Sequence, residues 1–403
     1  MIAVNISARG HLKRQLLTFG DVIVASASHP ELRIQGECMV NANESYRRHN
    51  THTCHKHCKS KEDSMTGDEI GHCQKCKKFN STNKLPNAPQ PTFATKIKKS
   101  LISNLGNTAL TQMLIMMFVS TVLVAASIGL AIMLGTNAQI EKKACHNTEN
   151  YNYYDVNCNI SATQRFQEDS GGWGSFNHTV QLTSLPPDLL KNELVSFCIS
   201  NGAQFIYSLL YVLMIYNLTL VTQEYRWGKL EHKRKRLRCT MVKGDNFEQC
   251  YLLQLPKKIL IPVMVYSVLT HWVLGEALQT QECIWSDINP GRRIEHSIYT
   301  ISYATYPLWS ATLLILVMTS ICWWAFTFRR EGFMPQMFGS IRVLCASTTQ
   351  LDDFPLNGIQ WGDLGMGKQF RHAGLSSEQV KKIVPYEIYA GTGELGDDGG
   401  RSD

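Results

Sequence analysis

Residues 223–258, QEYRWGKLEHKRKRLRCTMVKGDNFEQCYLLQLPKK, lie between two long apolar runs and decide how the rest of the chain is interpreted. They contain ten Lys or Arg residues against four Asp or Glu residues, and the basic residues are densest from Lys233 to Arg238. A segment with this charge is too polar to cross a bilayer, and its sign is typical of a loop on the cytoplasmic side. We therefore predict a basic cytosolic loop at 223–258, which sets the orientation of the neighbouring segments.

Charged residues are distributed so unevenly along the 403 residues that several long windows contain none. Uncharged runs of 41, 30 and 33 residues occupy 100–140, 194–223 and 296–328, and a shorter run of 17 residues occupies 259–275. Crossing a hydrocarbon layer about 30 Å thick takes about 20 apolar residues. The runs therefore predict membrane-spanning helices, although a mean hydropathy of −0.15 and a net charge of +7 would suit a basic soluble protein.

The predicted fold class is an all-α integral membrane protein with four transmembrane helices and flexible cytosolic N- and C-terminal regions. The predicted segments are an N-terminal region 1–111, a first span 112–134, an outer loop 135–195, a second span 196–222, the basic loop 223–258, a third span 259–278, an outer loop 279–305, a fourth span 306–328 and a C-terminal region 329–403. Lysines before the first span and Arg329-Arg330 after the fourth place both termini in the cytosol. Plasma membrane and endomembrane remain equally open.

The predicted outer loop 135–195 has the opposite charge balance, with four basic and seven acidic residues. It contains two glycosylation sequons, which begin at Asn159 and Asn177. Cysteines on this side of the membrane would meet an oxidising compartment. Four candidates for disulfide bonds are present, and their three pairings stay open: Cys145, Cys158, Cys198 and Cys283.

A cluster of Cys and His residues lies in the polar N-terminal region. Its C-x3-C and C-x2-C pairs are Cys54, Cys58, Cys73 and Cys76. Four thiolates at this spacing can surround one tetrahedral Zn²⁺ ion, with nearby histidines as substitutes. We nevertheless predict a variable tail without any cofactor, because the segment lacks the apolar residues that a zinc module buries around its metal, and the zinc site is the alternative.

Polar side chains inside the predicted spans suggest one possible internal site. Asn201 and Gln204 lie in the second span and His271 lies in the third. Polar groups at membrane depth usually hydrogen-bond to other helices, and an ionisable residue there is a functional-site hypothesis by default. A transporter or channel subunit with a polar path near His271 and Gln204 is therefore the alternative function.

Several short motifs resemble a family of uncharacterised filamentous-fungal multi-pass membrane proteins that carry a domain of unknown function. The motifs are Leu17-Thr18-Phe19-Gly20-Asp21-Val22-Ile23, the segment Tyr207–Arg226 followed by Trp227, Leu269-Thr270-His271-Trp272-Val273-Leu274, and Ile359-Gln360-Trp361-Gly362. Members of that family are usually longer, so we expect a shortened relative or a truncated gene model. The resemblance implies a membrane location but no activity, substrate or cofactor.

No catalytic motif of a hydrolase, metalloprotease or phosphate-binding loop occurs in the sequence, and we predict that the protein is not an enzyme. We expect a membrane-embedded scaffold, sensor or interaction protein. Its expected partners are membrane lipid and other membrane proteins, and not nucleic acid. The side chains expected to contact anionic lipid or an acidic partner are Lys233, Arg234, Lys235, Arg236 and Arg238.

Overall fold

The computed structural model describes residues 18–42, 91–147, 180–185, 190–249, 255–289, 292–367 and 369–392. The chain divides into two compact units. One, here called the helical unit, comprises Leu110–Leu218 and Pro256–Ala325, and the other, here called the mixed unit, comprises Met1–Ala109, Thr219–Leu255 and Phe326–Asp403. The boundary between the two units falls within three of the long helices.

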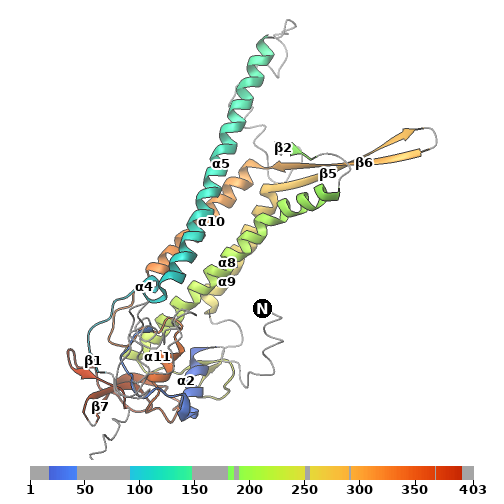
Figure 1. The fold of residues 1–403 in the computed structure, drawn as a ribbon. Coiled ribbons are helices and arrows are strands. Elements are labelled where there is room, and N and C mark those ends of the chain that lie inside the picture. The colour runs from blue at the N-terminus through green and yellow to red at the C-terminus, as the bar shows by residue number, and fades with distance from the viewer. Residues whose placement is uncertain are drawn as a thin grey trace, which may run out of the picture. The chain divides into compact units, whose positions relative to one another are not determined.

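In the described part of the chain, four long helices carry the apolar runs of the sequence (Figure 1): α5 (Asn107–Asn147), α8 (Leu190–His232), α9 (Lys257–Ala277) and α10 (Thr305–Thr327). By length and composition, each of them is apolar enough to cross a membrane. This confirms the prediction of four apolar helices of membrane-spanning length. Both ends of the predicted outer loop 135–195 are helical, because α5 continues to Asn147 and α8 begins at Leu190.

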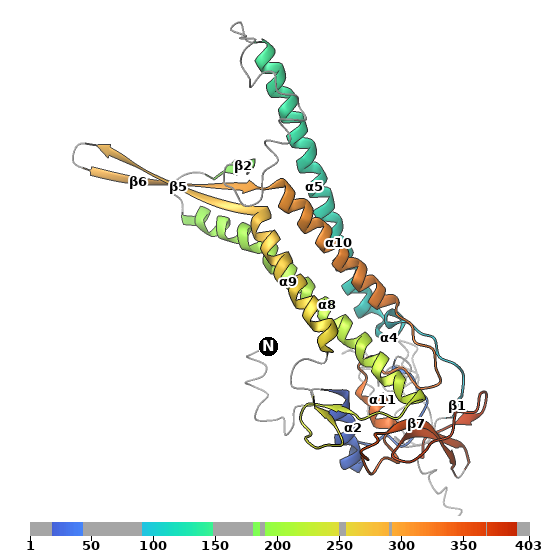
Figure 2. The ribbon, with the colours of Figure 1, turned by 180° about the vertical axis from the view of Figure 1, so that it is seen from behind.

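Small hydroxyl side chains join the helices of the helical unit, in which α5 lies beside α10 and α8 beside α9 (Figures 1 and 2). Two hydroxyl pairs connect α5 to α10, Ser120 with Thr319 at 2.5 Å and Ser127 with Thr312 at 2.8 Å. The Tyr266 hydroxyl on α9 donates to the Leu314 carbonyl on α10 at 2.6 Å. Small hydroxyl residues let two helix backbones approach closely and hydrogen-bond across the interface.

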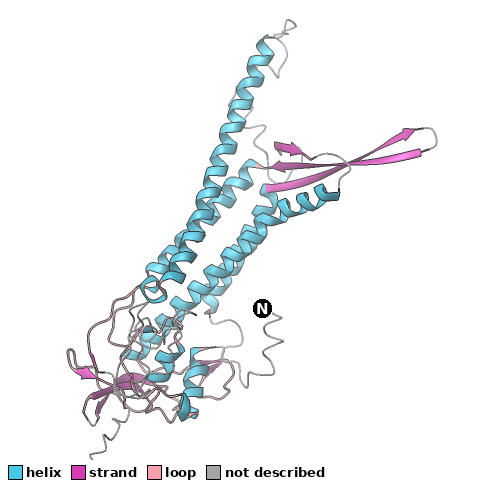
Figure 3. Cartoon of the chain, viewed as in Figure 1, coloured by secondary structure: helices cyan, strands magenta, loops and turns pink. Residues whose placement is uncertain are grey.

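A three-stranded antiparallel sheet of order β2-β6-β5 completes the helical unit (Figure 3). Its strands are β2 (Val180–Ser184), β5 (Leu278–Asn289) and β6 (Arg292–Tyr303). The all-α class is therefore wrong, and the segment 279–305 that connects α9 to α10 contains two strands. Isoleucine, threonine and tyrosine, which favour strands, are frequent in β5 and β6, and Pro290-Gly291 between them is a turn-forming dipeptide. The polar composition of residues 279–305 suggested a loop, but a sheet with exposed faces has the same composition.

The mixed unit combines short helices with a four-stranded sheet of order β1-β9-β8-β7. The helices are α2 (Phe19–Ser28), the 3-10 helix η1 (Pro30–Leu32), α4 (Leu101–Leu105) and α11 (Ile341–Ala346). The strands of the sheet are β1 (Thr92–Phe93), β7 (Gln360–Met366), β8 (Arg371–Ser376) and β9 (Ile388–Tyr389), and a separate parallel pair joins β3 (Arg238–Cys239) to β4 (Glu248–Gln249).

The core of the mixed unit is assembled from segments that lie far apart in the sequence. Ile23, Trp227, Trp361 and Tyr389 are each at most 1% exposed and belong to one apolar cluster. The prediction of flexible terminal regions is therefore wrong for residues 29–42, 91–105, 329–367 and 369–392. Each of these segments contributes only a few apolar residues without a long periodic run, so the core forms only when the segments pack together.

The prediction of a loop over 223–258 is wrong for residues 223–232, because they form the last turns of α8. Charge excludes a segment from the bilayer core but does not end a helix, and Glu, Arg and Lys all favour helices. Beyond the helix, Lys235 exchanges two backbone hydrogen bonds of 3.0 Å with Ile359. Gly358 permits this approach, since a Cβ atom there would lie 2.1 Å from the Lys235 carbonyl carbon.

Candidate functional site: a buried charge network at the end of α8

Glu224, Trp227 and Glu231 project from one face of the last turns of α8 into the mixed unit. Their spacing of three and then four residues places them on the same side of the helix. Glu224 and Trp227 are 0% exposed, and the side chain of Glu231 is 12% exposed. A buried carboxylate needs an ionic or hydrogen-bonding partner, because its desolvation is otherwise strongly unfavourable.

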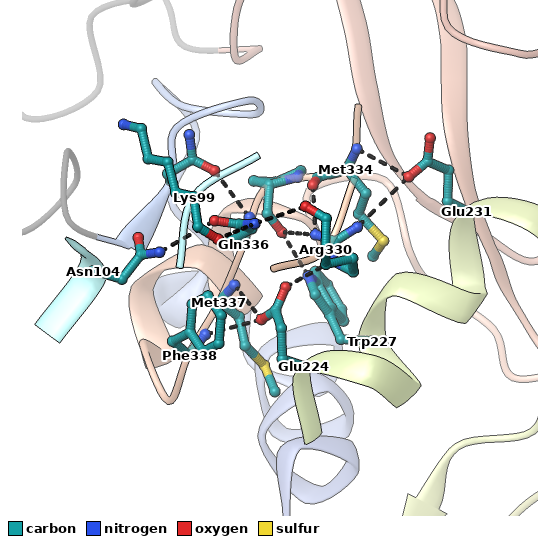
Figure 4. Close-up of polar contacts among 12 residues, drawn as sticks. Lys99, Asn104, Glu224, Trp227, Glu231, Arg330, Met334, Gln336, Met337 and Phe338 are labelled. Carbon is teal, nitrogen blue, oxygen red and sulfur yellow. Dashed lines mark hydrogen bonds and ion pairs between the residues drawn. The ribbon is translucent and has the colours of Figure 1, made fainter. Parts of the chain in front are cut away.

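Arg330, three residues after the end of α10, is the cationic partner of both carboxylates (Figure 4). Its Nε donates to Glu224 Oε1 at 2.8 Å, and its Nη1 lies 3.6 Å from Glu231 Oε2, an ion pair too long for a hydrogen bond. Its Nη2 donates to the carbonyl oxygens of Met334, at 2.7 Å, and Pro335, at 3.2 Å. One guanidinium group therefore joins α8 to the segment that follows α10.

Backbone N–H groups of the segment 333–338 complete the coordination of the two carboxylates. Glu224 Oε2 accepts from Met337 N at 2.8 Å and from Phe338 N at 3.0 Å. Glu231 accepts from Phe333 N at 3.0 Å and from Met334 N at 3.2 Å. The Trp227 indole N–H donates to the Pro335 carbonyl at 2.8 Å. Hydrogen bonds therefore hold residues 330–338 against the last turns of α8.

Gln336 extends the network to the N-terminal segments of the chain. Its side-chain Nε2 donates to the backbone carbonyls of Lys99 and Arg330, both at 3.0 Å, and its Oε1 accepts from Asn104 Nδ2 at 3.1 Å. Its backbone N–H donates to Asn41 Oδ1 at 3.0 Å. Three separate segments of the mixed unit therefore meet at one buried amide (Figure 4).

The charged groups of the network are mutual partners. The charged groups of the network are engaged by one another and by the backbone, and two carboxylates against one guanidinium leave one formal negative charge. Among the described residues, no group of three His, Cys, Asp or Glu side chains could hold a metal ion. The network therefore joins the last turns of α8 to the segment that follows α10 within the mixed unit.

Asp21 makes a second buried anchor, between α2 and the strand β3. It forms a capping box with Thr18, whose side chain accepts from Asp21 N at 3.3 Å while Thr18 N donates to Asp21 Oδ2 at 3.0 Å. The same carboxylate accepts from Thr240 N at 3.1 Å and Met241 N at 3.0 Å. Gly20 allows this contact, since a Cβ atom there would lie 2.3 Å from the Arg238 carbonyl oxygen.

The predicted lipid-contact residues lie on a structured segment rather than a free loop. Arg234 Nη2 donates to the Ser377 carbonyl at 2.6 Å, Arg236 Nη1 donates to the Asp245 carbonyl at 3.2 Å, and Arg238 is half-buried in β3. Lys233 and Lys235 are exposed. The two lysines are therefore the members of this cluster whose charged groups are most available, and the arginines contribute to the fold as well.

Of the three predicted intramembrane polar residues, the structure brings two to the interface between α8 and α9. His271 Nε2 lies 3.4 Å from Ser208 Oγ, and its ring meets the Tyr207 ring edge to face at 4.8 Å between centroids. Gln204 lies against α9, because a Cβ atom at Gly275 would be 3.1 Å from its Nε2. Asn201 is exposed and donates to the Phe197 carbonyl of its own helix at 3.0 Å, so it does not join them.

Other predicted sites cannot be compared with the structure. Cys54, Cys58, Cys73 and Cys76 lie outside the described residues, as do Cys158 and the two sequons. Cys198 and Cys283 are free, exposed thiols. The zinc site and the disulfide pairings therefore stay predictions.

A further polar network lies within the sheet of the mixed unit. The buried Asp363 carboxylate accepts from Arg371 Nη2 at 2.6 Å and from the Tyr389 hydroxyl at 3.0 Å. His372, which is 3% exposed, contacts the Thr349 hydroxyl through Nε2 at 2.8 Å and the Ala390 carbonyl through Nδ1 at 2.9 Å. Burial lowers the pKa of His372, while the Ala390 carbonyl and the Asp363 charge act in the opposite direction.

We expect the mixed unit to lose stability as the pH falls below about 6.5, where the unfolded His372 ring binds a proton that the buried ring resists. The lowered pKa means that the neutral ring stabilises the fold fully above that pH, and the contribution disappears toward the pKa of the folded state. Urea unfolding at pH 7.5 and 5.5 measures the change, and His372→Gln should flatten it. An equal pH dependence in both proteins would contradict the assignment.

Sequence reasoning missed the network of Glu224, Glu231 and Arg330. It used the charges of this region only to orient the helices, and it did not consider which of them could be buried. One pattern could have indicated the site: Glu224, Trp227 and Glu231 have the spacing of one helix face, directly after an apolar run. The partner Arg330 has no comparable pattern in the sequence.

Comparison with known proteins adds one match. A family model described as a domain of unknown function, DUF8419, matches residues 151–389. No curated protein and no solved structure matches the chain. The matched region contains the α8 network, the basic segment and His271, whereas Asp21 lies before it.

Proposed function

The chain belongs to the family described as a domain of unknown function, DUF8419, and we propose that it is a multi-pass integral membrane protein that acts as a scaffold or interaction protein. Four helices of membrane-spanning length and apolarity support the membrane assignment. The motifs that resemble filamentous-fungal multi-pass membrane proteins support it as well, because they include parts of α8 and α9.

The observation that carries the proposal is the exposed face of α9. Its large apolar side chains recur at helical spacing and are each more than half exposed: Ile261, Met264, Val265, Val268 and Trp272. A surface helix of a soluble protein would carry polar residues at these positions. The buried side of α9 is also mainly apolar, so the helix has apolar side chains on both sides, as a helix surrounded by lipid and packed on other helices does.

The polar side chains of the helical unit support a packing function. Ser127 and Thr312 hydrogen-bond across an interface, and Ser120 and Thr319 do the same. The groove on α10 is lined by apolar side chains apart from Ser320, whose hydroxyl donates to the Leu316 carbonyl of its own helix. The four hydroxyls paired between α5 and α10 hold these helices together, as in a membrane scaffold.

The orientation can be tested with a native thiol and one introduced thiol. Cys283 is exposed in β5, in the region expected on the outer side, and Arg236 is exposed in the region expected in the cytosol. An impermeant maleimide should label Cys283 in intact cells and should label Arg236→Cys only after permeabilisation, with the labelled peptides identified by mass spectrometry.

The matched control is Cys283→Ser, which should lose the labelled peptide in intact cells. Labelling at position 236 but not at Cys283 before permeabilisation would reverse the proposed topology. Release of the protein from membranes by alkaline carbonate would reject the integral assignment itself.

One observation favours a transporter or channel subunit as the second candidate. His271, Ser208 and Gln204 bring titratable and polar groups to one helix interface. Substrate-dependent flux in proteoliposomes that disappears in His271→Ala would support this alternative. Unchanged flux or none at all would leave the scaffold function in place.

A further inference from the structure

Two side chains on the exposed side of the last turns of α8 form an aromatic and cationic pair. Tyr225 is 52% exposed, and the Lys229 ammonium group lies 3.9 Å from the centroid of its ring. A spacing of four residues places the two side chains next to each other on the helix surface. The pair is therefore held in one geometry, with an exposed phenol ring and a half-buried lysine.

A second lysine, Lys235, lies three residues beyond the end of α8. Lys235 is exposed, and its charge acts on the Tyr225 phenol. Its backbone is fixed by the two hydrogen bonds to Ile359 and by the close approach of Gly358. The position of this lysine is therefore determined by the core of the mixed unit and not by a loose loop.

Among the described residues, no acidic side chain pairs with the positive charge at this surface. Glu224 and Glu231, the acidic residues of the same helical turns, face the opposite way and are engaged by Arg330 and backbone N–H groups. Within the described residues, neither Lys229 nor Lys235 forms an ion pair with a carboxylate. The surface therefore carries two unneutralised ammonium groups beside one phenol.

The location along the chain matches the depth of lipid headgroups. Tyr225 follows Val221, the last residue of the apolar run of α8, by four residues, which is about 6 Å along a helix. Tyrosine is enriched where a helix leaves the hydrocarbon core, and lysine side chains extend their charged ends toward the phosphate layer.

We propose that Tyr225, Lys229 and Lys235 form a binding site for the phosphate group of an anionic membrane lipid. The inference rests on the proposed membrane function, and it assigns a ligand class to one surface of the mixed unit. A phenol O–H and two ammonium groups supply donors for several phosphate oxygens, and hydrogen bonds of this charged kind are about twice as strong as neutral ones.

The test uses the full-length protein, purified in a neutral detergent and titrated with dioctanoyl phosphatidic acid. Saturable stabilisation against thermal unfolding yields an apparent Kd. Lys229→Gln and Lys235→Gln should each raise that Kd about fivefold, since one basic group near an anionic surface contributes about 1 kcal/mol. Tyr225→Phe, which keeps the ring and removes the hydroxyl, should raise it by a smaller factor.

Lys243→Gln is the matched control, because Lys243 is an exposed lysine of the same unit outside the proposed site. It should leave the Kd unchanged, and all variants should unfold at the wild-type temperature without lipid. Dioctanoylglycerol, which has the same chains without phosphate, should not stabilise the protein. Equal Kd values in the wild type and both lysine variants would overturn the site.

Inorganic phosphate separates a lipid site from a site for a free anion. Stabilisation by millimolar phosphate equal to that by the lipid would overturn the lipid assignment. If the proposed membrane function is wrong, the result is different. Alkaline carbonate would then release the protein from membranes, and the released protein would still bind phosphatidic acid through Lys229 and Lys235. Lipid binding that depends on both lysines, in a protein that carbonate does not release, supports both proposals.

Discussion

Replacing Arg330 by methionine is expected to lower the free energy of unfolding of the mixed unit by about 3–5 kcal/mol. The guanidinium group is the only cation paired with Glu224 and Glu231 among the described residues, and its side chain is 9% exposed. Methionine fills much of the same volume, so the loss reflects two buried carboxylates without their cation and the Met334 carbonyl without its Arg330 donor.

Thiol labelling in urea measures this loss within the mixed unit. Cys38 is 2% exposed, and burial raises its pKa to about 12, so it reacts only when the unit opens. Labelling of the Cys38 peptide as a function of urea concentration yields the free energy of unfolding. The matched control is Lys98→Met, which breaks the exposed ion pair with Glu331 and should change it by less than about 1 kcal/mol.

A double variant separates the ion pair from the packing around it. Adding Glu224→Gln to Arg330→Met removes the charge that the first substitution left unpaired. We expect the combined loss to be smaller than the sum of the single losses by about 1–3 kcal/mol. Strict additivity, or a loss below 1 kcal/mol for Arg330→Met alone, would contradict the network as described.

Replacing Asp21 by alanine is expected to destabilise the mixed unit by about 3 kcal/mol, because it removes a helix cap and several hydrogen bonds to one charged acceptor. The carboxylate is 1% exposed, so the N–H groups of Thr240 and Met241 would lose their acceptor inside the protein. The same labelling of Cys38 measures the effect.

Asparagine at position 21 should give an intermediate loss, because its amide keeps one accepting oxygen and introduces a donor where the other oxygen was. Asp245→Ala is the matched control, since Asp245 is an exposed aspartate nearby in the sequence and should change stability by no more than about 0.5 kcal/mol. A loss in Asp21→Ala no larger than that of the control would show that Asp21 does not anchor β3 to α2.

The four apolar helices could be predicted because the free energy that drives them is local to each segment. The preference of a run such as 100–140 for an apolar medium follows from its own composition and does not depend on neighbouring segments. The ends of the helices were harder to predict from the sequence. Helix α8 continues through Tyr225 and Lys229, because charged side chains do not interrupt its backbone hydrogen bonds. The strands β5 and β6 were missed because a strand depends on a partner, and the polar composition of 279–305 did not indicate one.

By itself, the sequence determined which segments are apolar, where the basic residues are densest and which residues could orient the chain in a membrane. Only the tertiary structure decided which charges are buried. Glu224 and Arg330 are 106 residues apart, and neither lies in a local sequence pattern that identifies the other as its partner. The physical reason is that the free energy of a buried charge depends on the atoms around it, and those atoms come from segments that meet only in the folded chain.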